Sequence, residues 1–252
     1  MQPNAVAVET GSQRRFQEAG ECRKGFAASV LGWAGTPGRS RTITLTAYSW
    51  VPPIVRGLVR DLRVRWALEE AGLPYRVELI DLQNKPDDYR DWQPWSQVPA
   101  YEEDGLRLFE SGAIVLHIAE KSPALAPQDP AAKARMTCWL FAALNSVEPP
   151  MQELALLDFM HADKEWAKVR RPMIVEFVQR RLKGLADALA GREFLEGGFS
   201  AADLVMASVL RMAKLTNLVA EAGLADYLGR CEGRPAFQKA LAGQLADFKD
   251  AA

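Results

Sequence analysis

Two short stretches in the first half of the chain alternate apolar and polar positions as β-strands do. They are ITLTAY at 43–48 and YRVELIDL at 75–82. Between them, LVRDLRVRWALEEAG at 58–72 repeats its apolar residues at helical spacing, and Gly72 ends the pattern as a C-terminal stop. The pattern therefore predicts a strand, a helix and a second strand in succession.

The stretch QVPAYEEDGLRLFESGAIVLHIAEK at 97–121 predicts a hairpin followed by a helix. Strands are expected near 98–102 and 106–109, because the acidic turn EEDG between them is short enough for antiparallel pairing. The helix is expected to begin at Glu110 or Ser111. With a short helix or irregular loop before this stretch, the order is β-α-β-α-β-β-α, which favours a mixed sheet.

Beyond the Pro-rich segment SPALAPQDP the strand pattern stops and the chain is helical in pattern. We expect Pro149 and Pro150 to break or kink the first helix, and Pro172 to make the second helix restart. Helices are expected near 131–147, near 163–190, from just after Phe199, and near 234–247.

These patterns predict an α/β domain followed by an all-α domain. The α/β domain is expected over 42–121, the linker over 122–130 and the all-helical C-terminal domain over 131–252. Residues 1–41 mix Gly, Ser, Arg, Gln and Glu without a sustained period. We expect this segment to be a disordered extension, or translated sequence upstream of the true start.

Composition narrows the possible partners. The chain has 252 residues and a formal net charge of -1, which gives no indication of nucleic acid or an anionic membrane as a partner. No apolar run approaches the roughly 20 residues that span a bilayer. Cys22, Cys138 and Cys231 lie far apart, which favours a reducing compartment, so we expect a cytoplasmic protein. With His117 and His161 as its two histidines, the chain offers little for zinc binding, and we expect no metal.

Three segments, in this order, resemble the glutathione S-transferase superfamily. RVRWALEEAGLPYRVELIDL resembles its first helix and second strand, and the stretch at 97–121 resembles its "VP…L…DG…L.ES.AI..Y" block. FLEGGFSAADLVMASVL resembles its C-terminal "FL.G…(S/T).AD" segment. The resemblance covers about 42–247. It implies a thioredoxin-like N-terminal domain, glutathione as co-substrate, transfer of its thiol to small hydrophobic electrophiles, and a homodimer.

The resemblance also gives a role to the Val-Pro and Glu-Ser pairs. In this family a cis proline follows the valine, and Val98–Pro99 then presents an outward backbone edge on which an extended peptide pairs like an added strand. Ser111 lies where a helix begins, and its hydroxyl and the free N–H groups there attract the γ-glutamyl carboxylate. Glu110 can pair the α-amino group, and Gln97 fits the glycine end. Other candidates for the glycine end are Gln83 and Lys85, with Trp92 and Trp95 beside them.

Without the resemblance, the same pairs also fit a purely structural interpretation. Val98–Pro99 would end a loop, and Glu110–Ser111 would be an ordinary helix start with Ser111 as N-cap. The order of the surrounding elements favours the ligand site.

Activation of the thiol is where the sequence departs from the family. A free thiol has a pKa of about 8.5 and is mostly protonated at neutral pH, so the family places a hydroxyl donor near the sulfur. Counting three residues back from Val64 reaches Asp61, where a Ser or Cys is expected. An aspartate there cannot exchange disulfides, and its charge would oppose a thiolate. The branches that need a cysteine, and the isomerase branch with Ser-Ser-Cys, therefore do not fit.

The remaining donors are Tyr48, Ser49 and Trp50, at the end of the first strand. Tyr48 has suitable chemistry, because its phenol stays protonated and can donate, although a strand aromatic often only packs. Arg56 would add positive potential, or is a solvated residue near the helix start. These four residues complete the candidate site.

Other residues are assigned structural roles or left open. Ser200 and Asp203 resemble a capping box with Asp in place of the usual Glu or Gln, so we expect them to start a helix. His117 is expected to be a packed histidine with a hydrogen bond. Candidates to line the electrophile site, which fit a helical core equally well, are Trp139, Phe141, Met151, Leu154, Phe159 and Met160.

Three functions remain open from the sequence. The first is a glutathione transferase. The second is a non-catalytic glutathione-fold binding or interaction protein that kept the peptide site and lost the thiol donor. The third is a glutathione-dependent peroxidase.

Overall fold

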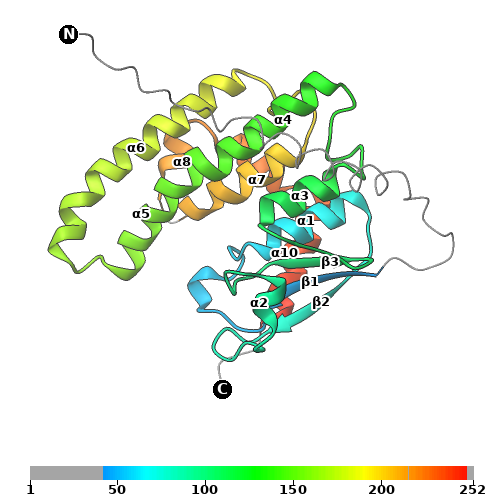
Figure 1. The fold of residues 1–252 in the computed structure, drawn as a ribbon. Helices are drawn as coiled ribbons and strands as arrows, with labels where there is room; N and C mark the ends of the chain where they lie inside the picture. The colour runs from blue at the N-terminus through cyan, green and yellow to red at the C-terminus, as the bar shows by residue number, and fades with distance from the viewer. Residues whose placement is uncertain (1–41, 215, 249–252) are drawn as a thin grey trace, which may run out of the picture. The chain divides into compact units, whose positions relative to one another are not determined.

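The computed structural model describes residues 42–214 and 216–248, and the sequence prediction for 1–41 lies outside them. The first part of the described chain forms a four-stranded sheet with helices around it (Figure 1). Its elements are β1 (Ile43–Tyr48), the short 3-10 helix η1 (Pro53–Val55), α1 (Asp61–Ala71), β2 (Tyr75–Ile80), α2 (Tyr89–Trp92), β3 (Ala100–Glu103), β4 (Leu106–Phe109) and α3 (Ser111–Ala119).

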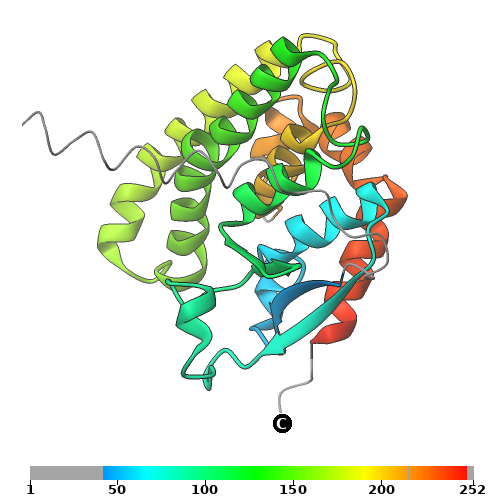
Figure 2. The same ribbon diagram turned by 45° about the vertical axis from the view of Figure 1, so that its right-hand side comes forward.

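The sheet is mixed, as predicted. Its strand order is β2-β1-β3-β4, with β1 parallel to β2 and antiparallel to β3, and β3 antiparallel to β4. At the EEDG turn, Asp104 and Gly105 have positive φ angles of 50° and 86°, the conformation that a tight hairpin turn requires. Helices α1 and α3 pack side by side on one face of the sheet (Figures 1 and 2). This arrangement is thioredoxin-like and confirms the predicted fold class of the first part.

The second part of the described chain is helical throughout. Here α5 and α6 lie side by side, and α10 returns to pack against α1 (Figures 1 and 2). Its elements are α4 (Pro130–Ala142), the π-helical turn η2 (Ala143–Val147), α5 (Glu148–Met160), α6 (Glu165–Leu189), α7 (Ala201–Leu210), the 3-10 turn η3 (Arg211–Ala213), α8 (Leu218–Glu221), α9 (Ala225–Glu232) and α10 (Pro235–Asp247). The short helices α8 and α9 had no counterpart in the sequence prediction.

The two proline predictions had different outcomes. The regular α-helix is interrupted next to Pro149 and Pro150, as expected: α4 ends at Ala142, the π-helical turn η2 follows, and both prolines lie in the first turn of α5, where backbone N–H groups need no intrahelical partner. The other prediction was wrong, since Pro172 does not make a helix restart but lies within α6. It is exposed, so water can satisfy the carbonyl it leaves unpaired, and the buried face of α6 that includes Ile174 and Val178 outweighs the roughly 3 kcal/mol cost.

The core joins both parts of the chain. Trp66 on α1 is fully buried, and its ring centroid lies 5.7 Å from that of Phe199 and 4.8 Å from that of Phe237. The predicted capping box is confirmed: Ser200 and Asp203 exchange hydrogen bonds at the start of α7. The predicted domain boundaries stay predictions, with α3 ending at Ala119 and α4 starting at Pro130. Among the described residues, no helix is both long and apolar enough to cross a membrane.

Candidate functional site

The structure brings the Val-Pro and Glu-Ser pairs to one cavity of about 440 Å³, which we call the polar cavity because it is more polar than the one that adjoins it. Gln97, Val98 and Pro99 line it immediately before β3, and Glu110 and Ser111 line it at the start of α3. The Val98–Pro99 peptide bond is cis, as expected. The spatial part of the sequence prediction is therefore confirmed: the two pairs lie together, on either side of the β3–β4 hairpin.

Glu110 has an uncommon backbone conformation. Its φ angle is 68° and its ψ angle is 110°, in a region that residues with a side chain seldom occupy. Such a conformation costs roughly 1–3 kcal/mol and is found most often at functional sites. No side chain caps α3, whose first internal bond runs from the Ile114 N–H to the Glu110 carbonyl. The N–H groups of Ser111 and the next two residues thus have no intrahelical partner, and all three residues line the cavity.

A hydrogen-bonded relay holds the Gln97–Ala100 backbone. The buried Tyr89 hydroxyl donates to the Gln97 carbonyl at 2.8 Å and lies 2.8 Å from the Thr46 hydroxyl oxygen. The Thr46 oxygen in turn accepts from the Ala100 N–H at 2.7 Å. Burial, as the main cause, raises the pKa of Tyr89 to about 12, so the phenol remains a donor at neutral pH. No local pattern indicated this role, because Thr46 lies 43 residues away from Tyr89.

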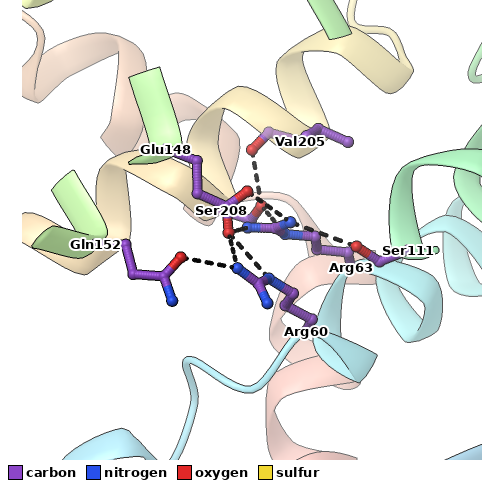
Figure 3. Close-up of polar contacts among 7 residues, drawn as sticks. All are labelled: Arg60, Arg63, Ser111, Glu148, Gln152, Val205 and Ser208. Carbon is purple, nitrogen blue, oxygen red and sulfur yellow. Dashed lines mark hydrogen bonds and ion pairs between the residues drawn. The ribbon is translucent and has the colours of Figure 1, made fainter. Parts of the chain in front are cut away.

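Two arginines and one glutamate that line the cavity form a cluster of polar contacts, which Figure 3 shows. Arg63 on α1 makes a two-pronged contact with Glu148 on α5: Nη1 lies 3.1 Å from Oε2 and Nη2 lies 3.0 Å from Oε1. Nη1 also donates to the Ser111 hydroxyl at 3.4 Å, and Nε donates to the Ser208 hydroxyl at 2.8 Å. Arg60 donates to Glu148 Oε1 through Nε at 2.9 Å and Nη2 at 2.7 Å.

The two arginines keep the Glu148 carboxylate ionised at neutral pH. Burial works to raise the pKa of Glu148, but the charges and hydrogen bonds of Arg63 and Arg60 outweigh it and lower the pKa. Sequence reasoning missed these three residues. The available signal was an acidic residue directly before Pro-Pro, but its partner on α1 lies 85 positions away.

A second cavity, also of about 440 Å³, adjoins the first and is mostly apolar. The two cavities share Arg60, Arg63, Gln97, Val98, Glu148 and Gln152. The apolar walls come from the η1 loop, from α5 and from η3, and include Ile54, Leu58, Val59, Leu156, Phe159, Met160 and Met212. Of the candidates named for an electrophile site, Phe159 and Met160 line this cavity and Phe141 lines the polar one.

Tyr48 alone among the proposed thiol donors lines a cavity, the apolar one. Burial raises the pKa of Tyr48, and a hydrogen bond with the Val98 backbone works against that rise. The Lys85 ammonium lies 5.7 Å from the centre of the Tyr48 ring. The Tyr48 hydroxyl therefore lies beside the Val98 backbone, on the boundary between the two cavities.

Ser49, Trp50 and Arg56, the other residues predicted to serve the thiol, line neither cavity. The Ser49 N–H donates to the Ile80 carbonyl at 3.0 Å, and the buried indole nitrogen of Trp50 has no hydrogen-bond partner in the described part of the chain. The Arg56 guanidinium lies 5.5 Å from the centre of the Phe248 ring. Of the alternatives near the glycine end, Gln83, Lys85, Trp92 and Trp95 also lie outside the polar cavity.

Asp61 does not face the site either, which corrects the expectation that its charge would oppose a thiolate. It is buried, accepts from Arg65 Nε at 2.8 Å and from the Gln244 amide at 2.7 Å, and so faces α10. Burial raises the pKa of Asp61 to about 6 against the opposing effect of Arg65. The helix α1 begins at Asp61, and the residues next to Asp61 that line the cavities are Leu58, Val59, Arg60 and Arg63.

His117 has the predicted packing role, with Nε2 lying 3.2 Å from a carboxylate oxygen of Glu103. Among the residues that the structure describes, no group of His, Cys, Asp and Glu side chains is arranged to hold a metal ion.

The described chain has a thioredoxin-like sheet followed by a helical part, and the polar cavity lies where the two meet. This combination defines the class of glutathione-fold proteins. Residues 44–120 match the family model for the glutathione S-transferase N-terminal domain. The chain is 27% identical over 191 residues to the probable maleylacetoacetate isomerase 1 of Drosophila melanogaster, covering 66% of this chain and 74% of that protein. Residues 44–120 thus carry a glutathione S-transferase N-terminal domain, and the described fold as a whole is similar to that of glutathione transferases.

Other relatives match a smaller part or a similar fold. The chain is 35% identical over 118 residues to the probable cytosolic glutathione S-transferase DHAR1 of Oryza sativa subsp. japonica, covering 44% of this chain and 55% of that protein. The chain thus spans about half the length of the rice protein. A solved glutathione transferase from Pseudomonas putida, with one glutathione disulfide bound per subunit, is 25% identical with a TM-score of 0.64, covering 81% of this chain and 93% of that one.

Proposed function

We propose that this protein binds glutathione in the polar cavity and transfers its thiol to small hydrophobic electrophiles held in the apolar cavity. The observation that carries the proposal is the junction of the two cavities at Gln97 and Val98, with the Tyr48 hydroxyl beside that edge. A cytoplasmic homodimer is part of the same proposal.

Glutathione lies extended along the Val98 backbone, as an added strand does. Its γ-glutamyl carboxylate meets the N-terminus of α3 and the Ser111 hydroxyl, where the unpaired N–H groups and the helix dipole favour an anion. Glu110 takes the α-amino group, and Gln97 the glycine end. Arg63, which donates to the Ser111 hydroxyl at 3.4 Å, adds positive charge behind that contact. The related Pseudomonas putida protein carries a glutathione disulfide.

Catalysis rests on stabilising the thiolate and on proximity. Tyr48 donates a hydrogen bond to the sulfur, which lowers the thiol pKa, and the proton leaves to solvent. The raised pKa of Tyr48, caused chiefly by burial, suits a phenol that stays protonated while it donates. With a chloronitroarene, the thiolate forms a carbon–sulfur bond, the carbon–chlorine bond breaks, and chloride leaves with the electron pair. Holding both reactants in adjoining cavities supplies the orientation.

The non-catalytic binding protein is the alternative that the site makes testable. Among the lining residues of the apolar cavity, Tyr48 is the one with a hydroxyl group, so a single substitution separates the two functions. The loop at 49–60 contains no cysteine, which disfavours disulfide exchange and the Ser-Ser-Cys chemistry of an isomerase. Peroxide reduction, which oxidises two glutathione molecules to the disulfide, is assayed on the same variants.

The test compares wild type with Tyr48→Phe in glutathione calorimetry, thiolate absorbance and chlorodinitrobenzene turnover. Wild type binds glutathione and forms the thiolate. The variant binds glutathione with similar affinity, but its bound thiol has a pKa higher by about 1–2 units, and turnover at neutral pH falls about 10- to 100-fold.

Tyr75→Phe is the matched control, because its hydroxyl donates to Glu69 at 3.2 Å and lines neither cavity. Absence of glutathione binding by wild type refutes the transferase and the binding protein together. Binding by wild type without thiolate formation or turnover leaves the non-catalytic protein as the function.

A further inference from the structure

The wall between the two cavities carries a surplus positive charge. Of the residues that line the apolar cavity, the charged ones are Arg60, Arg63 and Glu148, so two guanidinium groups face one carboxylate. The polar cavity adds Glu110 to the same three residues and is balanced. An uncompensated charge beside an apolar surface is costly unless a ligand or water meets it. The imbalance therefore indicates what the apolar cavity binds.

The surplus is located on Arg60. The Arg63 side chain is only 5% exposed, and its guanidinium is occupied by Glu148, Ser111 and Ser208. The Arg60 side chain is 39% exposed. Its Nε and Nη2 donate to Glu148, and Nη2 also donates to the side-chain amide oxygen of Gln152 at 3.1 Å. Nη1 of Arg60 makes no hydrogen bond or ion pair with the described part of the chain, so this edge can donate to a ligand.

The rest of the apolar cavity selects the other end of the ligand. Ile54, Leu156 and Met160 line it and are among the most exposed large apolar side chains of the described residues. They lie on the η1 loop and on α5, so the cavity can bury an apolar body between two elements. A molecule that fits both features has an apolar body and one anionic end.

We infer that the electrophiles taken by this protein are organic carboxylates, with the apolar body between the η1 loop and α5 and the carboxylate on the open edge of Arg60. The inference rests on the proposed transferase function and names its substrate class. The open Nη1 group can donate charge-assisted hydrogen bonds to a carboxylate, which a neutral ester cannot match in charge. Glutathione itself does not need this edge, because its γ-glutamyl carboxylate meets the start of α3.

The test uses chloronitrobenzoate and its methyl ester, together with the glutathione conjugate of each. Calorimetry measures the binding of both conjugates, and kinetics measure kcat/KM for both electrophiles. Wild type binds the carboxylate conjugate about ten-fold more tightly than the ester conjugate, the value of one hydrogen-bonded charge contact. In Arg60→Gln the ratio falls to about one, while Kd for glutathione and for the ester conjugate stays within about two-fold.

Two further variants keep the result interpretable. Arg60→Lys preserves the charge and retains most of the carboxylate preference. Arg180→Gln removes an arginine of α6 that lines neither cavity, and leaves the ratio unchanged. A ratio in Arg60→Gln equal to that of wild type overturns the inference. So does a glutathione Kd that rises in Arg60→Gln as much as that of the carboxylate conjugate, since Arg60 would then serve the peptide. Failure of wild type to bind glutathione and both conjugates overturns the proposed function itself.

Discussion

Glu148→Gln tests the view that the arginine cluster is a buried ion pair on which the fold depends. The Glu148 and Arg63 side chains are 6% and 5% exposed, so the pair is screened little by water. The substitution keeps the shape and one acceptor but leaves Arg63 as a buried cation without a counterion. Removing one partner of a buried pair costs about 3–5 kcal/mol, whereas the half-exposed contact with Arg60 adds about 0–1 kcal/mol. Because glutamine still accepts a hydrogen bond, we expect a loss of about 3 kcal/mol at neutral pH.

The pH dependence of this loss follows from the pKa. Arg63 and Arg60 overcome burial and hold the pKa of Glu148 below its ordinary value of 4.5. The folded protein therefore takes up the proton less readily than the unfolded chain does. The stability that Glu148 contributes is present at neutral pH, starts to decline as the pH falls to about 4.5, and is lost once the pH passes below the lowered pKa. The gap between wild type and Glu148→Gln closes over the same range.

Urea unfolding followed by circular dichroism at several pH values measures both effects. The matched control is Glu176→Gln, whose carboxylate is 68% exposed and pairs with Arg180 one helical turn away on α6. An exposed pair of this kind is worth about 0.3–0.5 kcal/mol. A loss for Glu148→Gln no larger than that of the control, or one that is the same at pH values above and below the transition, would show that the cluster is not a buried ion pair in solution.

Two further substitutions address the relay and the start of α7. Tyr89→Phe removes the hydroxyl that donates to Gln97. The free energy of unfolding, measured in urea, should therefore fall by about 1–2 kcal/mol. Calorimetry should show weaker glutathione binding while kcat at saturating glutathione is retained, and an unchanged Kd would contradict a positioning role. Asp203→Ala leaves the N–H groups of Leu195 and Ser200 and the Tyr227 hydroxyl without their acceptor in a buried site. A loss of about 3 kcal/mol or more is expected in thermal or urea unfolding, and a loss below about 1 kcal/mol would contradict the buried network.

The parts of the fold that the sequence predicted well depend on local signals. The EEDG turn predicted the hairpin because two adjacent residues supply the positive φ angles that the turn requires. Ser200 and Asp203 predicted the start of α7 because a capping box lies within four consecutive residues. The cavity around Val98 and Ser111 was predictable for the same reason, since both of its ends lie within one short stretch.

The parts that the sequence did not predict depend on partners far along the chain. Pro172 signals a helix break, and only the packing of α6 on its neighbours overrides that signal. Asp61 was assigned to the cavity by counting residues, but the direction of a side chain depends on where α1 begins and on the Gln244 amide that meets it. Arg63 and Glu148 become a pair only once the fold has brought α1 and α5 within reach of each other.

One side chain bears on how this protein can be divided. Arg63 belongs to the sheet-containing half, yet it touches Ser111 on α3, Glu148 on α5 and Ser208 on α7. Severing the chain between α3 and α4 would leave this guanidinium without its counterion, in a fragment where Trp66 has also lost two aromatic neighbours. Neither half is a self-sufficient module. When halves are exchanged between relatives, a half that carries the arginine must therefore be combined with a half that carries its carboxylate.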